Sequence, residues 1–599
     1  MKVICIFILL IYTQGLLSQS TWKRNYDLIH YRLRLDVNEK TRTFNGDITI
    51  KLLLIENNVE LIKLDATDLK ISEVKLRGQK LKFQLKDNKL AINLTKEYST
   101  DDTLELIINY SATNPKAGME FVESEAHKPY QNHSMYSMGY DRYNHYWFPC
   151  YDNPDDVDFV TSELIITVPE YLKVIAGGEL LKTEKRADGK ITYHWYEYHP
   201  HATYNICLFI TDYKEVKEVW KGIELSYYVK PEIADTLLKA LSITPKAMEF
   251  ISSILEYPYP FEKYAQAFFE NSLCNSNISA TTLNGTILPK EGAETIVHEL
   301  AHEWFGTVLT IKNACSVWLA EGFVDFIAGL FVGQGKQNNF FNNRINTLYS
   351  SIIQNDNHPE ISPPILRCDS LYSLYNSAGT RGEAVLHMLR NYLGEDPFWK
   401  GIRHWIKKHA FRVVDTDDFR IAMEETTGIN LYLFFKEFVY GHGHRKYNVH
   451  HRWDGKLKKL VMNVNRIDTN YSSLTFLPIP VDVEISVNDM MTTHHLTLSK
   501  LEEEFYIQAD TAPQMVIFNK GPKFLMEVLH EKSTDEWLYQ MSHAENEADR
   551  LDAMFHIKEF TDSEKVGEVL VQVVLHDPSE RVRNAADMWL MFFKKKLDE

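Results

Sequence analysis

Two histidines and a glutamate with metal-binding spacing occur in the run His298-Glu299-Leu300-Ala301-His302. The surrounding stretch, residues 295–309, has helical periodicity and contains no proline, so a helix is predicted there. Residues four apart share one face of a helix, and both imidazoles could therefore reach one tetrahedral metal ion. Glu299 would face the open position of that metal and take a proton from a water molecule as a general base.

A third metal ligand is predicted at Glu321, 19 residues after His302. A helix, a short connection and a second helix would bring this carboxylate beside the two imidazoles. Two histidines and one carboxylate are the ligand set of a catalytic zinc that keeps one position for water, so we expect one Zn²⁺ per chain. Asp325, one turn later, is either a hydrogen-bond acceptor for a ligand histidine or a charge on the helix surface.

The elements that must position these residues are indicated by the hydrophobic periodicity. Before residue 213 the pattern is β, because Ile48, Ile50 and Leu52 alternate with polar partners and Asp188-Gly189 is a hairpin signal. From about residue 232 to 440 the period is helical, so the metal-binding residues fall in a mainly helical part of the chain.

A second β region and a helical tail follow. Asp454-Gly455 marks a turn in the β region, and the tail contains two weakly similar helix pairs that resemble a short HEAT-like array. We therefore divide the chain into a signal peptide over 1–20, an N-terminal β domain over 21–212, a zinc-binding catalytic domain over 213–442, a second β domain over 443–521 and a C-terminal helical domain over 522–599.

Composition and charge narrow the class of protein. Of the 599 residues, 44% are hydrophobic, 12% aromatic and 25% charged, which excludes disordered and collagen-like classes. The formal net charge of −17 argues against a nucleic-acid partner, because phosphate binding needs clustered lysine and arginine. None of the 6 cysteines lies in a CxxC motif, so a thiolate zinc site is not expected.

The N-terminus has the pattern of a secretory signal. Lys2 precedes an apolar run over residues 3–12, and small residues follow at Ser18 and Ser20. This run is shorter than the roughly 20 apolar residues that span a bilayer, and no later segment reaches that length. We therefore expect an exported protein, periplasmic or secreted, with no transmembrane segment.

From about residue 25 to 520 the chain resembles the aminopeptidase N family of zinc metallopeptidases. The resemblance rests on the run from His298 to Gly306, on the Tyr257–Tyr264 segment and on the Trp147–Pro154 segment, which occur in the family's order. It implies a multidomain α+β fold: an N-terminal β saddle domain, a thermolysin-like, mainly helical catalytic domain, a small β-sandwich and a short C-terminal helical domain. It also implies zinc-dependent hydrolysis of peptide substrates with a free N-terminus.

The resemblance further implies a substrate-binding role for Glu270. The family's Gly-x-Met-Glu-Asn motif falls on Ala267-Phe268-Phe269-Glu270-Asn271, and Glu270 would bind the free α-ammonium of the substrate. A buried carboxylate forms charge-assisted hydrogen bonds with such a cation and restricts cleavage to the first residue. Ala267 and Phe269 replace the motif's glycine and methionine, and we expect Phe269 to narrow or reshape the first side-chain pocket.

Other departures from the family pattern affect catalysis. Gly379 stands where the family has a tyrosine that donates to the oxyanion, and removing one such donor typically costs roughly 100–1000-fold in turnover. Tyr375 or Tyr372 could replace it, or both could be packing residues. Tyr140 stands where the family has a second acceptor for the substrate amine. We therefore hold two hypotheses: a zinc aminopeptidase, and a zinc-retaining pseudoenzyme or peptide-binding scaffold with weak or no catalysis. The sequence indicates no oligomeric state.

Overall fold

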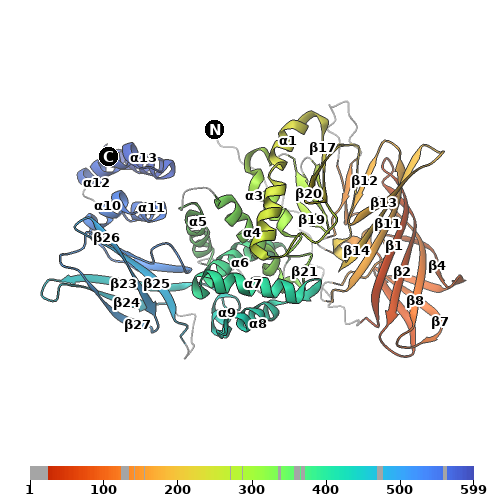
Figure 1. The fold of residues 1–599 in the computed structure, drawn as a ribbon, viewed down its shortest axis with the longest axis horizontal. Helices are drawn as coiled ribbons and strands as arrows, with labels where there is room; N and C mark the ends of the chain where they lie inside the picture. Colours follow the sequence, from red (N-terminus) through yellow and green to blue (C-terminus); the bar gives the residue numbers. More distant parts are fainter. Residues whose placement is uncertain are drawn as a thin grey trace.

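In the computed structural model, a mainly helical region lies between two regions of β-sheet (Figure 1). The structure describes residues 24–122, 134–139, 142–153, 156–269, 272–285, 288–334, 339–356, 365, 371–468, 476–557 and 563–598. The predicted signal peptide over 1–20 lies outside the described residues.

The N-terminal region consists of strands whose side chains alternate between core and solvent. In β2 the side chains of Ile48 and Ile50 are fully buried, and they face Ile108 and Leu106 of β8 across the sheet. An eight-stranded sheet has the order β13-β14-β11-β1-β2-β8-β4-β5, and a four-stranded and a three-stranded sheet complete the region. The predicted hairpin at Asp188-Gly189 joins β13 to β14. The strands are β1 Tyr26–Asn38, β2 Thr43–Leu54, β3 Val59–Asp65, β4 Lys70–Leu76, β5 Gln79–Lys80, β6 Lys82–Lys86, β7 Lys89–Tyr98, β8 Thr103–Thr113, β9 Met119–Phe121, β10 Met135–Ser137, β11 Phe159–Pro169, β12 Lys173–Ala176, β13 Glu179–Lys185, β14 Lys190–Ala202 and β15 Leu208–Thr211.

The central region combines a five-stranded sheet, of order β16-β17-β18-β20-β19, with nine α-helices among the described residues. The periodicity did not separate β18 and β20 from the predicted helices, because their residues are almost all buried and therefore do not alternate. The strands are β16 Lys214–Trp220, β17 Ile223–Val229, β18 Lys263–Phe269, β19 Asn275–Asn277, β20 Ala280–Asn284, β21 Leu309–Ile311 and β22 Arg412–Val414. The helices are α1 Ala234–Leu241, α2 Thr244–Leu255, α3 Leu288–Ala301, α4 Trp318–Gly333, α5 Asn339–Asp356, α6 Leu371–Leu393, α7 Glu395–His409, α8 Thr416–Thr427 and α9 Tyr432–Phe438.

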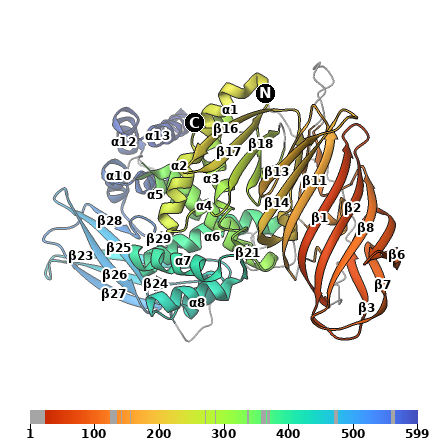
Figure 2. The same ribbon diagram turned by 45° about the vertical axis from the view of Figure 1, so that its right-hand side comes forward.

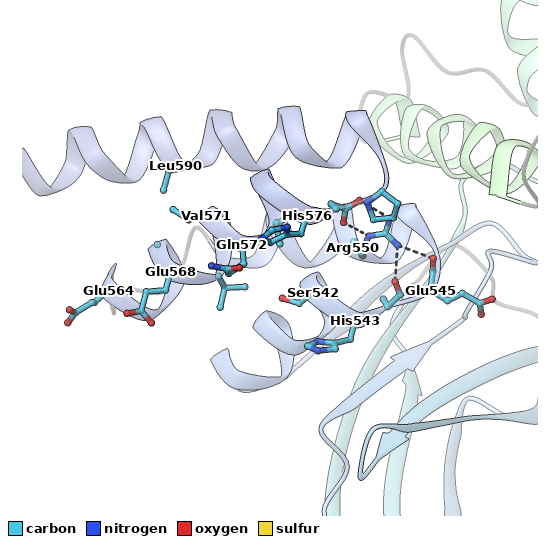
Figure 3. A pocket seen from close by; sticks show the side chains of 16 residues that line it. Ser542, His543, Glu545, Arg550, Glu564, Glu568, Val571, Gln572, His576 and Leu590 are labelled. Atoms are coloured by element: carbon cyan, nitrogen blue, oxygen red, sulfur yellow. Dashed lines mark hydrogen bonds and ion pairs between the residues drawn. The ribbon is translucent and has the colours of Figure 1, made fainter.

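The C-terminal region has two small sheets followed by helices that pack in pairs (Figure 2). The strands are β23 Arg445–Asp454, β24 Lys459–Arg466, β25 Ile479–Val487, β26 Met490–Leu498, β27 Glu502–Gln508, β28 Met515–Phe518 and β29 Met526–His530, and the helices are α10 Thr534–His543, α11 Glu547–His556, α12 Ser563–His576 and α13 Glu580–Asp598. Arg550 of α11 joins the two helix pairs, since its Nε donates to Asp577 at 2.7 Å and its Nη1 donates to the carbonyl of Ala544 at 2.8 Å (Figure 3).

The predicted fold class is confirmed, with a β-rich N-terminal region, a helical central region and C-terminal helices. One related expectation needs correction. The helix over Ala314–Gly333 is long and apolar enough to cross a membrane by length and composition, although no such segment was expected after the signal. About 67% of that window is buried inside the protein, and the helix carries Glu321. Its apolar faces are explained by its place in the core, where neighbours surround it.

Candidate active site

The two motif histidines lie at the C-terminal end of α3. The helix ends at Ala301 and not at residue 309 as predicted, so His302 is the first residue of the following turn. This turn continues the winding of the helix, since the N–H of Glu303 donates to the carbonyl of Leu300 at 3.1 Å. The two imidazoles therefore still share a face, and their ring centroids are 5.0 Å apart.

Glu321, in the first turn of α4, reaches both imidazoles. Its Oε2 is 3.7 Å from Nε2 of His298 and 3.9 Å from Nε2 of His302. In a tetrahedral site with zinc–ligand bonds of about 2.1 Å, the ligand atoms lie about 3.4 Å apart. A small inward shift would therefore let the three groups hold one zinc ion. The structure thus brings together all three predicted metal ligands.

Each imidazole has its Nδ1 engaged, which leaves Nε2 toward Glu321. Nδ1 of His298 donates to Oδ1 of Asp325 at 2.8 Å, and Nδ1 of His302 donates to the carbonyl of Phe305 at 3.1 Å. Such bonds fix the tautomer and the orientation of a ligand histidine. Of the two roles left open for Asp325, the structure therefore favours that of hydrogen-bond acceptor.

Glu299 and the three candidate ligands line one cavity of about 190 Å³. The side chain of Ser276, in β19, donates from its Oγ to Oε2 of Glu299 at 2.6 Å. This hydrogen bond engages one carboxylate oxygen and leaves the other to accept a proton. The cavity can therefore present a carboxylate base beside the remaining position of a bound metal.

The charge around His298 favours a cation. Burial lowers the pKa of this imidazole, but the hydrogen bond and charge of Asp325, followed by the charges of Glu299 and Glu321, raise it to about 9. Three carboxylates therefore surround one half-buried imidazole, and a divalent cation would relieve their repulsion. Two imidazoles and a carboxylate are also the donor types that zinc prefers, so the residues present fit this metal.

The close approach of α4 and α6 shapes one wall of the site. A Cβ atom added to Gly322 would lie 2.6 Å from the Cα of Gly382, so the two helices can meet only because both positions are glycine. One turn earlier on α6, a Cβ added to Gly379 would lie 2.6 Å from Oδ2 of Asp325. The missing side chain at Gly379 thus leaves the space that the Asp325 carboxylate occupies while it accepts from His298.

The predicted substrate residues are described only in part. Glu270 and Tyr140 lie outside the described residues. Tyr372 and Tyr375 fall in α6, but their side chains also lie outside the described part of the chain. Their predicted roles therefore stay predictions.

Phe269 is described, and it packs in an aromatic cluster outside the cavity of the candidate metal ligands. Its side chain is fully buried, and its ring stacks on that of Tyr136 with centroids 5.0 Å apart. Tyr213 contacts the same ring at 5.6 Å. Phe269 is not among the residues that line the cavity around Glu299. Any effect of Phe269 on a substrate side chain would have to act through this aromatic cluster.

Several residues that line the cavity were not predicted as site residues, and Ser276 and Tyr204 are the two with hydroxyl groups considered for the chemistry. Tyr204 lies in a short 3₁₀ helix, Thr203–Asn205, and its hydroxyl donates to the carbonyl of Gly306 at 3.4 Å. Burial raises the pKa of Tyr204 to about 12, so its hydroxyl stays protonated and can act as a donor. Neither residue belongs to a recognisable motif; both reach the cavity through packing between segments far apart in sequence.

Larger cavities occur elsewhere in the described part of the structure. One of about 1220 Å³ lies among the C-terminal helices, beside Arg550 and His576 (Figure 3). None of the predicted site residues lines it. The small cavity around Glu299 is therefore the stronger candidate for catalysis despite its size.

Two family models match the chain. The "Peptidase M1 N-terminal domain" matches residues 28–205, and the "Peptidase family M1 domain" matches residues 239–438. The second match contains all three candidate metal ligands and Glu299.

Several relatives carry aminopeptidase names. "Probable aminopeptidase 1" of Sulfurisphaera tokodaii is 25% identical over 431 residues, which cover 68% of this chain and 52% of the relative. "Endoplasmic reticulum aminopeptidase 1" of Mus musculus is 26% identical over 424 residues, which cover 65% of this chain and 45% of the relative. The chain thus spans about half the length of the curated relatives it matches.

A solved structure shares the fold. The crystal structure of Legionella pneumophila aminopeptidase A in complex with aspartic acid has a TM-score of 0.79 at 15% identity, covering 95% of this chain and 68% of that chain. At this identity the likeness concerns the fold alone.

Proposed function

The chain belongs to the M1 family of peptidases, and we propose that it is a zinc-dependent aminopeptidase that removes N-terminal residues from peptides. The observation that carries this proposal is the convergence of His298, His302 and Glu321 in one cavity with Glu299. The aminopeptidase names of the relatives support the same reaction class.

His298, His302 and Glu321 would hold one Zn²⁺ per chain. When bound, the ion supplies a Lewis acid that lowers the pKa of a water molecule to about 7 and polarises a carbonyl. Asp325 and the carbonyl of Phe305 hold the two imidazoles in the ligating orientation beforehand. The site therefore needs little reorganisation to accept the metal.

Glu299 would move the proton. Because Ser276 engages Oε2, the free Oε1 takes a proton from the attacking water and later gives it to the nitrogen of the leaving amine. The buried carboxylate stays oriented during both transfers, since Ser276 is itself fixed in β19. No covalent bond between the chain and the substrate is required.

The chain would hold the substrate by its α-ammonium and by the oxyanion that forms from its scissile carbonyl. Glu270 would bind the α-ammonium, as the family resemblance implies. A donor is also needed for the oxyanion, because Gly379 has no side chain. Among the described residues Tyr204 is a candidate for this role beside Tyr375 and Tyr372, since its side chain lines the cavity; its hydroxyl would have to turn from the carbonyl of Gly306, to which it donates at 3.4 Å.

A pseudoenzyme that retains zinc is the less favoured alternative. It was suggested by Gly379, which lacks the family's tyrosine. In this structure, however, the space at Gly379 is taken by the carboxylate of Asp325, which supports a metal ligand. The glycine therefore changes the arrangement of the site but leaves the three predicted metal ligands together.

Export to the periplasm or the exterior is part of the proposal. It is supported by the charged and apolar pattern of residues 2–12 and by Cys315, which is disulfide-bonded. Disulfides persist mainly in oxidising compartments. N-terminal sequencing of the mature protein should find a start near residue 19 or 21, and a start at Met1 would contradict export by this signal.

A single set of assays tests the catalytic proposal. Purified full-length protein should release the reporter from at least one of a panel of aminoacyl reporter substrates, and a chelator should abolish this release. Glu299→Gln should retain zinc and lose roughly 100–10,000-fold in kcat, because the general base is removed. Glu249→Gln, on the exposed face of α2, is the matched control and should behave as the wild type. Zinc-loaded wild type without turnover on any substrate would establish the pseudoenzyme.

A further inference from the structure

A second group of metal-binding side chains lies outside the catalytic cavity. Glu197 and His199 come from β14 of the eight-stranded sheet, and Glu262 directly precedes β18 of the five-stranded sheet. One potential ligand atom from each of the three residues lies within 4.8 Å of the other two. Among the described residues, only this group and the group of His298, His302 and Glu321 meet that condition.

His199 is held in a fixed orientation before any ion arrives. Its ring stacks on Phe411 with centroids 5.2 Å apart and meets Phe261 edge-on at 5.3 Å. Its Nδ1 lies 2.9 Å from Oε1 of Glu197, the length of a hydrogen bond, and a zinc ion held by both atoms would need them about 0.5 Å farther apart. Little side-chain entropy would therefore be lost on binding.

Glu197 accepts two hydrogen bonds on Oε1, from the backbone N–H and from Nδ1 of His199 at 2.8 and 2.9 Å. Its side chain is only 1% exposed, and its Oε2 is buried without a hydrogen-bond partner in the described part of the chain. The nearby ammonium of Lys263 donates instead to the carbonyl and hydroxyl of Ser279, at 2.9 and 3.3 Å. A buried carboxylate with an unpaired oxygen is costly unless a cation completes its surroundings.

An ion can reach the group from solvent. Glu262 is exposed, and it lines a cavity of about 540 Å³ together with Lys263 and the exposed Glu179. Of the three residues only Glu262 lines this cavity, and the His199 side chain is itself 25% exposed. One imidazole and two carboxylates match the mixed nitrogen and oxygen donors of zinc.

We propose that Glu197, His199 and Glu262 form a second zinc site, which ties the N-terminal sheet to the sheet of the catalytic region. Two ligands come from one sheet and the third from the other, so bound metal would oppose separation of the two regions. This role is structural, since none of these residues lines the catalytic cavity.

The test counts zinc ions in the full-length chain. Protein stripped with a chelator, reloaded with Zn²⁺ and passed through gel filtration should retain two equivalents by elemental analysis. Glu262→Gln, an exposed position that should fold normally, and His199→Gln should each retain one. Glu179→Gln lines the same cavity without being a ligand and should retain two. His302→Gln should also retain one, because it loses the catalytic ion alone.

Thermal unfolding gives an independent readout. The second equivalent should raise the melting temperature of the wild type and should leave that of Glu262→Gln unchanged. One retained equivalent in the wild type, or two in both His199→Gln and Glu262→Gln, would overturn the proposal and leave an ordinary ion pair between Glu197 and His199. Loss of aminopeptidase activity with two ions bound would count against the proposed function and not against this site.

Discussion

Two parts of the candidate active site differ in how closely the chain follows the residue pattern of the family. The metal side consists of the predicted metal ligands, and the substrate side consists of the positions predicted to contact the substrate. On the metal side, His298, His302 and Glu321 have the residue types and spacing that a zinc site demands, and the structure brings them together. On the substrate side, Gly379 and Phe269 replace residues of the family pattern. The structure places the Asp325 carboxylate beside Gly379 and stacks Phe269 on Tyr136.

The difference reflects two kinds of physical constraint. A metal ion fixes the distance and direction of each ligand within a few tenths of an ångström, so few residue types and spacings satisfy it. An oxyanion or a substrate side chain needs only a donor or a surface at the right place, and several elements of the fold can supply it. Substitutions on the substrate side should therefore show which other residue has taken over a role. Substitutions on the metal side should instead cause loss of the metal.

The oxyanion donor gives the largest expected effect on the substrate side. Tyr204→Phe should lower kcat by roughly 100–1000-fold with little change in KM, because the hydroxyl would act only in the transition state. Tyr375→Phe, measured beside it on the same reporter substrate, should keep nearly full activity. The reverse result would return the role to α6 and remove Tyr204 from the mechanism.

The sequence could predict the metal side because its signal is local. The i, i+4 spacing of His298 and His302 needs only one helical turn, and Glu321 needs only a following helix. The support for Glu299 by Ser276 and the contact between Gly379 and Asp325 could not be predicted, because each joins segments that meet only through tertiary packing.

The same distinction holds for the fold. Alternation in β2 and the Asp188-Gly189 turn indicated strands and a hairpin that the structure contains. The buried strands β18 and β20 gave no alternation. The end of α3 at Ala301 was missed because Phe305 and Val308 continue an apolar pattern after the hydrogen bonds have changed. Periodicity reports which face is buried, and it fails where every face is buried.

Recognition of the substrate amine gives the next effect. Glu270→Ala should raise KM by roughly 10–100-fold, since a charge-assisted hydrogen bond to a cation contributes about 1.5–3 kcal/mol. The variant should also discriminate less against substrates whose amine is blocked by acetylation. Glu249→Ala serves as a surface control. Unchanged KM and unchanged selectivity would take Glu270 out of the amine site.

The contact between Asp325 and Gly379 couples the two sides and can be measured through zinc affinity. Asp325→Ala should weaken zinc binding roughly 10–100-fold, because His298 loses the acceptor that orients it. Gly379→Ala should weaken it about tenfold, since the new Cβ would lie 2.6 Å from Oδ2 of Asp325 and displace it. Chelator competition on both proteins provides the affinities.

The double variant separates this coupling from general damage. If Gly379→Ala acts only through Asp325, the pair should lose no more affinity than Asp325→Ala alone, whereas independent effects would add. Gly379→Ala should also hold or raise the melting temperature, because alanine stabilises a helix by up to about 1 kcal/mol over glycine. Additive losses, or a marked fall in melting temperature, would mean that the glycine serves the α4–α6 packing and not the metal ligand.

The smallest effect is expected at Phe269, and it tests whether this buried residue belongs to the substrate side. Phe269→Met should lower stability by about 0.5–1.5 kcal/mol, because the stacked contact with Tyr136 is lost. The preference among aminoacyl reporter substrates should change by less than about threefold, since a 1.4 kcal/mol change in recognition would already give tenfold and Phe269 does not line the cavity. A tenfold shift in preference would instead show that a fully buried ring sets the shape of the first side-chain pocket through Tyr136 and Tyr213. The substrate side would then extend into the aromatic cluster, and its departure from the family pattern would be one of specificity as well as of catalysis.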